Sequence, residues 1–258
     1  MSLACLDGTV CDAAEATIPV TDEGLLRGDG VFEVARLYNG RAFALDEHLA
    51  RMEGSAARLR LAIDVRAVER DVATLVEAAG ATDARVRMVV TRGGRRIVLL
   101  EEQKPNPPSV SLACVEYVPP RILDGVKSLS YAGNMLATRL AKERGFDEAL
   151  LVTPHGRVLE APTSSFFYVI DGELLTPPLD DHILESITRR HVMELTDARE
   201  RITPRDDVRR MSEAFIASST REVQAVHAIE DHELERGGAL TRDAAARLRE
   251  RIAEATAA

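Results

Sequence analysis

The chain has 258 residues, of which 42 are acidic and 33 basic, so its formal net charge is −9. An acidic chain whose bases form no dense run repels a polyanion, which excludes nucleic acid as an expected partner. Hydrophobic residues make up 45% of the sequence, enough for a substantial core, yet no apolar run approaches the ~20 residues of a membrane span. The N-terminus lacks a secretory pattern and the three cysteines form no CxxC pair, so we expect a soluble cytoplasmic protein.

The first half of the chain reads as hairpins and amphipathic helices. Asn39-Gly40 between apolar runs is a strong hairpin signal, Asp46 is placed to cap the helix that follows, and Gly80 is placed to end the next one. In chain order we expect a hairpin over 30–45, helices over 45–61 and 66–79, a hairpin over 84–100 and a strand over 108–118.

The second half continues the same mixture after a break at Pro119-Pro120. We expect a helix over 133–145 and strands over 148–152, 156–160, 164–170 and 173–178, with a turn at Asp171-Gly172 before the last. Hairpins outnumber strand–helix alternations, which favours mixed, mainly antiparallel sheets with packed helices over a parallel doubly wound sheet. The class is therefore α+β, with a smaller N-terminal domain over 1–118 and a larger C-terminal domain over 119–258.

Lys127 is one of only three lysines among the 33 basic residues, and Val126 and Leu129 give it an apolar setting. Loss of water from the charged form lowers the pKa of such a lysine and makes a neutral, nucleophilic amine available, as a Schiff base needs. The alternative is a strand-end lysine that extends its ammonium to water. This residue alone leaves both interpretations open.

Four other places carry weak signals of the same kind. Glu160, at the end of an expected strand, is able to hold a heteroaromatic nitrogen protonated, or is a solvated glutamate. Residues 186–188 at a helix start and 218–220 after a strand offer amides and hydroxyls to a phosphate, or are ordinary caps. Arg51 lies away from the apolar face of its helix and is by default solvated.

Taken in order, these segments resemble the class IV, or fold type IV, pyridoxal-phosphate enzymes. The resemblance is carried by "GDGVFEVARLYNG", "EHLARM", "VKSLSYAGNMLA", "DEALLVTPHGRVLEAPTSSFFYV", "ILESITRR" and "EAFIASSTREVQAV", over roughly residues 20–245. The family includes D-amino-acid aminotransferases, branched-chain aminotransferases and aminodeoxychorismate lyases.

The resemblance implies that pyridoxal 5'-phosphate binds in a cleft between the two domains and that Lys127 forms the internal aldimine. It implies that Glu160 pairs with the pyridine nitrogen and that Tyr131 hydrogen-bonds the phenolic oxygen. The phosphate contacts it implies come from Arg51, Ile187, Thr188 and Ser219.

Family members are at least homodimers, and the stretch "VTDEGLLRGDG" resembles the loop with which one subunit closes the partner's site. We therefore expect a homodimer with shared active sites. No metal is expected, because the six histidines lack ligand spacing.

The expected reaction moves an amino group between an amino acid and a 2-oxo acid such as 2-oxoglutarate or pyruvate. Among the substrate-binding positions, Phe32 and Val34, the valine favours D-amino acids: a lyase is expected to carry threonine there, and branched-chain enzymes carry glycine. Aminodeoxychorismate lyase, forming 4-aminobenzoate and pyruvate, and branched-chain L-amino-acid or (R)-amine transaminases remain the alternatives.

The usual carboxylate-trapping loop of the D-amino-acid enzymes is missing, since "TRGGRRIVLL" is too short to supply it. Arg87, within an apolar strand, is suited to a bidentate carboxylate. We hypothesise that Arg27 and Arg87 form a substitute trap. The alternative is that Arg87 pairs with an internal acid while Arg27 faces solvent.

Overall fold

The structure is a computed structural model that describes residues 2–257, and these divide into two compact units. The first unit holds residues 2–104, 125–131 and 254–257, and the second holds 105–124 and 132–253. The predicted division into domains at residue 118 stays a prediction. Between residues 2 and 257, no helix combines the length and the apolar character needed to cross a membrane.

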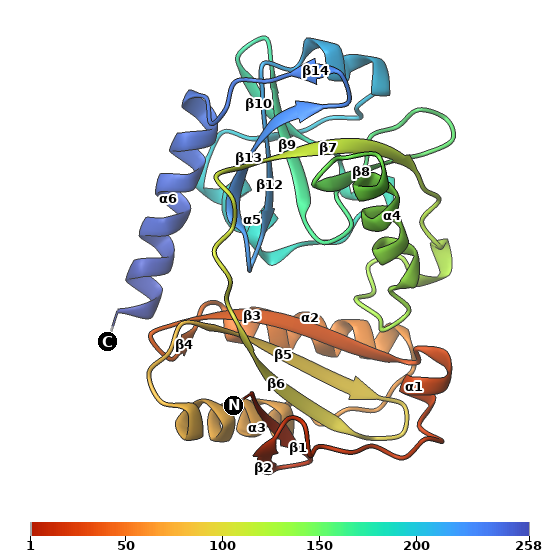
Figure 1. The fold of residues 1–258 in the computed structure, drawn as a ribbon, viewed down its shortest axis with the longest axis vertical. Helices are drawn as coiled ribbons and strands as arrows, with labels where there is room; N and C mark the ends of the chain where they lie inside the picture. The colour runs from red at the N-terminus through yellow and green to blue at the C-terminus, as the bar shows by residue number, and fades with distance from the viewer. Residues whose placement is uncertain (1, 258) are drawn as a thin grey trace. The chain divides into compact units, whose positions relative to one another are not determined.

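The first unit is built on a six-stranded antiparallel sheet of order β2-β1-β6-β5-β3-β4 (Figure 1). Helices α2 and α3 pack against this sheet, where their apolar side chains meet the inward residues of the strands. The elements are β1 (Leu3–Leu6), β2 (Thr9–Asp12), α1 (Glu23–Arg27), β3 (Gly30–Tyr38), β4 (Arg41–Ala42), α2 (Leu45–Arg58), α3 (Val65–Ala79), β5 (Ala84–Thr91) and β6 (Arg96–Glu102).

The second unit is built on a mixed eight-stranded sheet of order β11-β10-β9-β12-β13-β7-β8, with β14 on β13. Antiparallel pairs occupy its middle, and β7 runs parallel to both β13 and β8. The elements are β7 (Ser109–Glu116), η1 (Arg121–Leu123), α4 (Ala132–Glu143), β8 (Glu148–Val152), β9 (Ser165–Ile170), β10 (Glu173–Thr176), η2 (Leu179–Asp181), α5 (Ile187–Leu195), β11 (Arg199–Glu200), η3 (Arg205–Arg210), β12 (Glu213–Ser218), β13 (Glu222–Ile229), β14 (His232–Glu233) and α6 (Ala239–Thr256). The predicted α+β class with mixed, largely antiparallel sheets is thus confirmed.

Both predicted two-residue hairpin turns are present, with the backbone that their sequence requires. Asn39 and Gly40 have φ of 49° and 80°, and Asp171 and Gly172 have φ of 53° and 80°. Positive φ at both central residues is the mark of a type I′ turn, whose twist matches that of the flanking strands. These turns fix the register of β3 with β4 and of β9 with β10.

Two local predictions were wrong. Asp46 does not cap α2: the helix begins one residue earlier, at Leu45, and its N-cap is Ala44 with no side-chain hydrogen bond. Residues 156–160 do not form a strand but make only isolated bridges. Leu151 donates its N–H to Glu160 O while accepting from Leu159 N–H, so two residues oppose one and the bulge stops a regular ladder.

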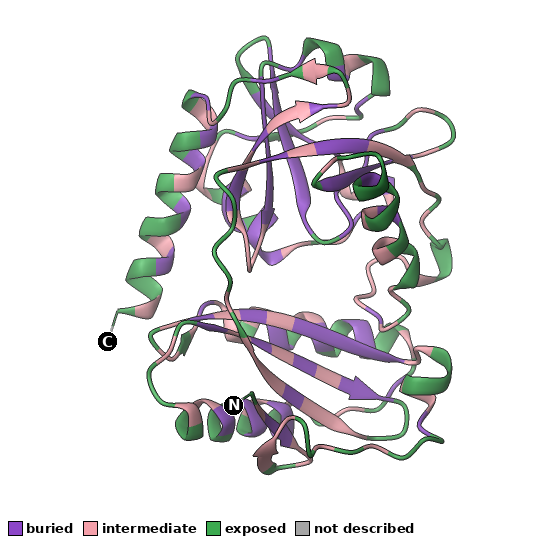
Figure 2. Cartoon of the chain, in the orientation of Figure 1, coloured by how far each residue is buried: buried purple, intermediate pink, exposed green. Residues whose placement is uncertain are grey.

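Burial alternates along most of β5 and along the second half of β3, as the colour bands of Figure 2 show. Val31, Ala35 and Leu37 are fully buried, whereas Phe32 and Val34 lie on the opposite face of β3. The face that carries Phe32 and Val34 is therefore the one away from the helix-covered core.

Candidate active site

Lys127 is held against β3 by backbone pairing. Phe32 N–H donates to Lys127 O at 3.1 Å, Leu129 N–H donates to Gly30 O at 2.9 Å, and Val31 bridges Ser128 in antiparallel register. Because residues across a ladder share a face, this register puts the Lys127 side chain on the Phe32 face of the sheet. The segment 127–129 thus extends the first sheet alongside the start of β3.

A second contact secures the same segment from the helix side. Lys127 N–H donates to Ser55 Oγ of α2 at 3.1 Å, and Ser55 is buried. The lysine backbone is therefore fixed between a strand and a helix.

The Lys127 amine lies against two aromatic rings. Nζ is 4.4 Å from the centre of the Phe32 ring and 5.7 Å from that of Tyr131. The rings meet edge to face, with centres 5.2 Å apart and planes at 80°. The structure therefore brings together three of the residues that the sequence singled out, and the half-buried setting of Lys127 is aromatic rather than aliphatic.

Val34 and Arg87 lie on the same sheet face, directly opposite each other in the β3–β5 ladder. The Arg87 guanidinium carbon is 5.8 Å from the Phe32 ring centre, and Nε donates to Glu101 Oε1 at 2.9 Å. Arg87 also reaches Glu101 Oε2 through Nη2, at 3.2 Å. In this chain Arg87 is therefore paired with an internal acid, as the alternative interpretation expected.

Arg27 lies elsewhere, at the last position of the short helix α1. Its side chain is 71% exposed and its nearest acid is Glu23, at 3.6 Å. The structure does not bring Arg27 and Arg87 together, and a joint carboxylate trap stays a prediction.

Arg51 is not solvated, contrary to the default expectation for its helix position. Its side chain is 15% exposed and makes a bidentate ion pair with Glu33, both hydrogen bonds being 2.7 Å long. His48 Nδ1 approaches Glu33 Oε2 at the same distance. The Arg51 side chain extends from α2 to the buried Glu33 carboxylate on the helix-facing side of β3.

The charge state of this cluster follows from burial and pairing. Burial alone raises the pKa of the Glu33 carboxyl, but Arg51 and His48 outweigh it and lower that pKa to about 2. Burial lowers the pKa of His48, and the hydrogen bond to Glu33 only partly offsets this effect. Glu33 is thus ionised and His48 neutral near pH 7, so the carboxylate fixes the Arg51 guanidinium.

Sequence reasoning missed Glu33 and His48. The sequence does contain a usable signal. Glu33 occupies the alternate strand position between Val31 and Ala35, so its carboxylate points to the same inward face as Val31, Ala35 and Leu37. A buried carboxylate requires a donor, and the nearest helix offers Arg51.

In the second unit, Glu160 is one of the two bulged residues that oppose Leu151 of β8. Its Oε1 accepts a hydrogen bond from Leu184 N–H at 3.0 Å, and its side chain is half-buried. Burial raises the pKa of Tyr117, and the negative charge of Glu160 adds to this effect. Glu160 therefore acts on its surroundings as an anion held in place by a backbone amide.

The start of α5 has the features of an anion-binding helix end. Ser186 is its N-cap and accepts a hydrogen bond from Arg189 N–H at 3.3 Å. Ile187 and Thr188, its first two residues, are 3% and 4% exposed. Amides of the first helical turn have no partner within the helix, so this end favours a negative group.

Ser219 lies in the tight turn between β12 and β13, which Arg221 N–H closes onto Ser218 O at 3.1 Å. Three serine hydroxyls, Ser164 Oγ, Ser165 Oγ and Ser218 Oγ, are buried and have no hydrogen-bond partner among residues 2–257. Unpaired buried hydroxyls are costly in a finished core and indicate a place for a polar ligand.

Each unit therefore carries part of the donor set that pyridoxal phosphate requires. The first supplies an amine beside aromatic rings and a fixed guanidinium, and the second supplies a carboxylate, a helix N-terminus and unpaired hydroxyls. These residues fit the cofactor. Over the described residues, no group of three or more histidine, cysteine or acidic side chains is arranged to hold a metal ion.

Comparison with known proteins agrees with this chemistry. The model of the class IV amino-transferase family matches residues 30–229. A putative branched-chain-amino-acid aminotransferase of Methanocaldococcus jannaschii is 32% identical over 253 residues, covering 87% of each chain. A D-alanine aminotransferase of Bacillus licheniformis is 28% identical over 277 residues, covering 97% of each.

Solved structures are similar over nearly the whole chain. A fold IV transaminase from Curtobacterium pusillum is 28% identical with a TM-score of 0.86, covering 96% of this chain and 99% of that one. A branched-chain aminotransferase from Thermoproteus uzoniensis is 27% identical with a TM-score of 0.91, covering 98% and 95%. The chain belongs to the class IV aminotransferases, and it is a pyridoxal-phosphate-dependent enzyme of fold type IV.

Proposed function

We propose that this enzyme transfers amino groups between a D-amino acid and a 2-oxo acid such as 2-oxoglutarate or pyruvate. The observation that carries the proposal is the Lys127 amine, held by backbone pairing against the rings of Phe32 and Tyr131. Val34, on the same sheet face, supports the D-amino-acid assignment, as do relatives named D-alanine aminotransferase.

Lys127 is the residue to which we assign both cofactor attachment and proton transfer. Bound pyridoxal phosphate supplies an electron sink for negative charge at the substrate Cα. Lys127 Nζ would hold the cofactor at its carbonyl carbon, with that oxygen lost as water, and the freed amine would take the proton from the substrate Cα as a general base. The fixed backbone and the rings of Phe32 and Tyr131 limit the positions that the Lys127 amine reaches.

We assign the remaining cofactor contacts by charge. Glu160, held by Leu184 N–H, would keep the pyridine nitrogen protonated, and the Tyr131 hydroxyl would donate to the phenolic oxygen. Arg51, residues 187–188 and Ser219 would hold the phosphate. Glu33 already neutralises the charge of Arg51. We therefore propose that Arg51 binds the phosphate through correctly oriented N–H donors, and not through an unpaired charge.

Substrate binding involves Phe32, Val34 and the two proposed carboxylate ligands. Arg87 is paired with Glu101, so it binds a substrate carboxylate only by sharing or exchanging that partner. Arg27, exposed on α1, is assigned as the second ligand.

We propose a homodimer with shared active sites, in which the stretch 20–30 closes the partner's site. Leu25 and Leu26 of α1 support this assembly, since they are 59% and 62% exposed in the single chain.

We also propose a cytoplasmic location. Cys5, Cys11 and Cys114 are free thiols, which supports a reducing compartment.

A branched-chain L-amino-acid transaminase is the second candidate. It is favoured by the relative from Methanocaldococcus jannaschii and by the structural neighbour from Thermoproteus uzoniensis, both named as branched-chain enzymes.

A substrate panel decides between the two candidates. The holoenzyme is given D-alanine, D-glutamate or L-leucine with pyruvate or 2-oxoglutarate, and the 2-oxo acid formed is measured. We expect kcat/KM for a D-amino acid to exceed that for L-leucine by at least about tenfold. Lys127→Ala is the inactive control, and a preference for L-leucine assigns the enzyme to the branched-chain reaction instead.

Replacing Arg87 tests the carboxylate assignment. We expect Arg87→Ala to raise KM for the preferred amino acid by at least about tenfold while leaving an (R)-amine without a carboxylate unaffected. Arg85→Ala is the matched control, because Arg85 lies on the same face and reaches the same Glu101 at 3.7 Å. Equal losses for the acid and the amine contradict the assignment.

The Glu33 cluster predicts a pH dependence of stability. The pKa of Glu33 is about 2 in the folded chain against 4.5 ordinarily, so its ionisation stabilises the fold fully above pH 4.5 and progressively less as pH falls toward 2. We expect Glu33→Gln to lower Tm at pH 7, because it leaves Arg51 without its buried counter-ion.

The Tm difference between wild type and Glu33→Gln should narrow below about pH 4.5 when followed by circular dichroism. Glu53→Gln, an exposed change on α2, the helix that carries Arg51, serves as control. A difference that stays constant from pH 7 to the acid limit of folding shows that the Glu33 charge is not what stabilises the cluster.

A further inference from the structure

Arg221 closes the turn that carries Ser219, yet its side chain does not point freely into solvent. The turn spans Ser218 to Arg221, and the side chain of Arg221 is only 20% exposed. Glu222, next in the chain, has φ of 56°, a left-handed backbone that a glutamate adopts only where its surroundings enforce it. Something beyond the turn's own sequence therefore holds its shape.

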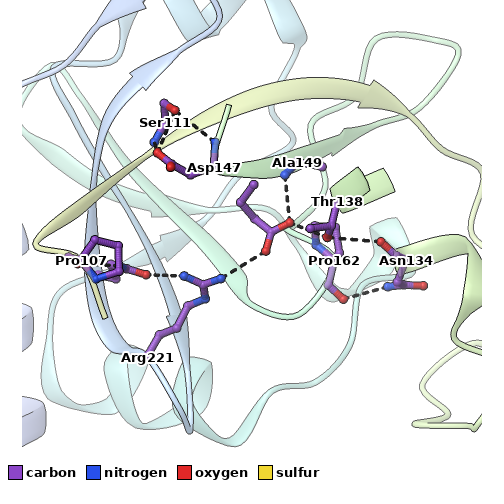
Figure 3. Close-up of polar contacts among 10 residues, drawn as sticks. Pro107, Ser111, Asn134, Thr138, Asp147, Ala149, Pro162 and Arg221 are labelled. Atoms are coloured by element: carbon purple, nitrogen blue, oxygen red, sulfur yellow. Dashed lines mark hydrogen bonds and ion pairs between the residues drawn. The ribbon is translucent and has the colours of Figure 1, made fainter. Parts of the chain in front are cut away.

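The Arg221 guanidinium joins two separate partners. Nη1 donates to Gln224 Oε1 at 2.5 Å, and Nη2 donates to Glu148 Oε2 at 3.2 Å. Gln224 is itself buried and donates to Pro107 O at 2.6 Å. A planar guanidinium held at two nitrogens has little freedom to rotate, so it fixes the end of the turn (Figure 3).

Glu148 is a carboxylate buried at the start of β8, with a side chain 5% exposed. Its Oε1 accepts from Thr138 Oγ1 at 2.6 Å and from Ala149 N–H at 3.0 Å, while Oε2 accepts from Arg221. Both oxygens are thus satisfied, and Arg221 supplies the compensating charge. Removal of the arginine leaves a buried, uncompensated anion.

The same chain of contacts continues through α4 to the loop after Glu160. Thr138 lies one helical turn beyond Asn134, whose Nδ2 donates to Pro162 O at 2.9 Å. Pro162 follows Glu160 by two residues. Figure 3 shows the whole path, from the Arg221 turn through Thr138 and Asn134 to Pro162.

We infer that Arg221 and Glu148 are positioning residues, which hold the Ser219 turn in register with the loop of Glu160 so that the cofactor phosphate is bound. Neither residue is assigned a contact with cofactor or substrate. The inference rests on the proposed function, because it takes Ser219 as a phosphate ligand. The unpaired Ser218 Oγ in the same turn gives it independent support.

The test compares two ligands that differ only in the phosphate. Apoenzyme is titrated with pyridoxal phosphate and with pyridoxal, and both dissociation constants are measured by absorbance for wild type and Arg221→Met. We expect Arg221→Met to weaken pyridoxal phosphate by at least about fivefold while pyridoxal stays within about twofold of wild type. A general loss of stability moves both constants together and overturns the inference.

Arg249→Met is the matched control. Arg249 on α6 pairs with Glu222 of the same hairpin at 3.3 Å, but its side chain is 67% exposed and it does not contact Glu148 or Gln224. We expect neither dissociation constant to change. If Arg249→Met weakens pyridoxal phosphate as much as Arg221→Met does, then any arginine paired with the hairpin has this effect, and the specific role of Arg221 is rejected.

A double variant tests whether Glu148 and Arg221 act together. Glu148→Gln combined with Arg221→Met should cost no more phosphate affinity than the worse single change, and additive losses contradict a shared role. If Arg221→Met does not fold, Arg221→Lys takes its place, since one ammonium does not span both partners, and the same selective loss is expected.

The wild-type titrations separate this inference from the proposed function. A wild type that binds neither ligand rejects the proposed function itself, whereas one that binds both equally rejects only the phosphate assignment and this inference.

Discussion

The antiparallel pairing of residues 127–129 with the start of β3 is the constraint on which the candidate site depends. The chain leaves the first unit after residue 104 and re-enters it for residues 125–131 before α4 begins. Backbone hydrogen bonds at Phe32 and Leu129 set the register of that short return. A slip of one residue would turn the Lys127 side chain to the other face of the sheet, away from Phe32.

A second constraint operates on the opposite side of β3, where Glu33 faces the helices. The same strand thus carries a ring for the Lys127 amine on one face and a carboxylate for Arg51 on the other. Strand alternation accounts for both, since Phe32 and Glu33 are neighbours. The proposed catalytic lysine and the proposed phosphate arginine are positioned by consecutive residues, which makes β3 the organising strand of the first unit.

The features that the sequence predicts well are those encoded by neighbouring residues. Type I′ turns at Asn39-Gly40 and Asp171-Gly172 depend only on local backbone preference, and α3 ends at Gly80 as predicted. The strand expected at 156–160 failed because its pairing contains a bulge, which alternation does not reveal. The cap expected from Asp46 failed because the preceding hairpin already sets the start of α2.

Side-chain partners across distant segments are harder to predict than the fold. The aromatic setting of Lys127 comes from Phe32, ninety-five positions earlier, and the Glu148–Arg221 pair joins residues 73 apart. Arg51 was expected to be solvated because helix periodicity describes one element, whereas its partner Glu33 lies on another. Arg87 lies within a strand as expected, but its pairing with Glu101 depends on the register of β6.

The central claim is that Lys127 is the residue that holds the cofactor, and chemical trapping tests it most directly. The protein is incubated with pyridoxal phosphate, reduced with borohydride, digested and examined by mass spectrometry, with Lys104 and Lys142 as internal comparisons. The account predicts a yellow protein before reduction and a phosphopyridoxyl group on Lys127 alone. A colourless protein with no adduct, or an adduct spread evenly over the three lysines, contradicts it.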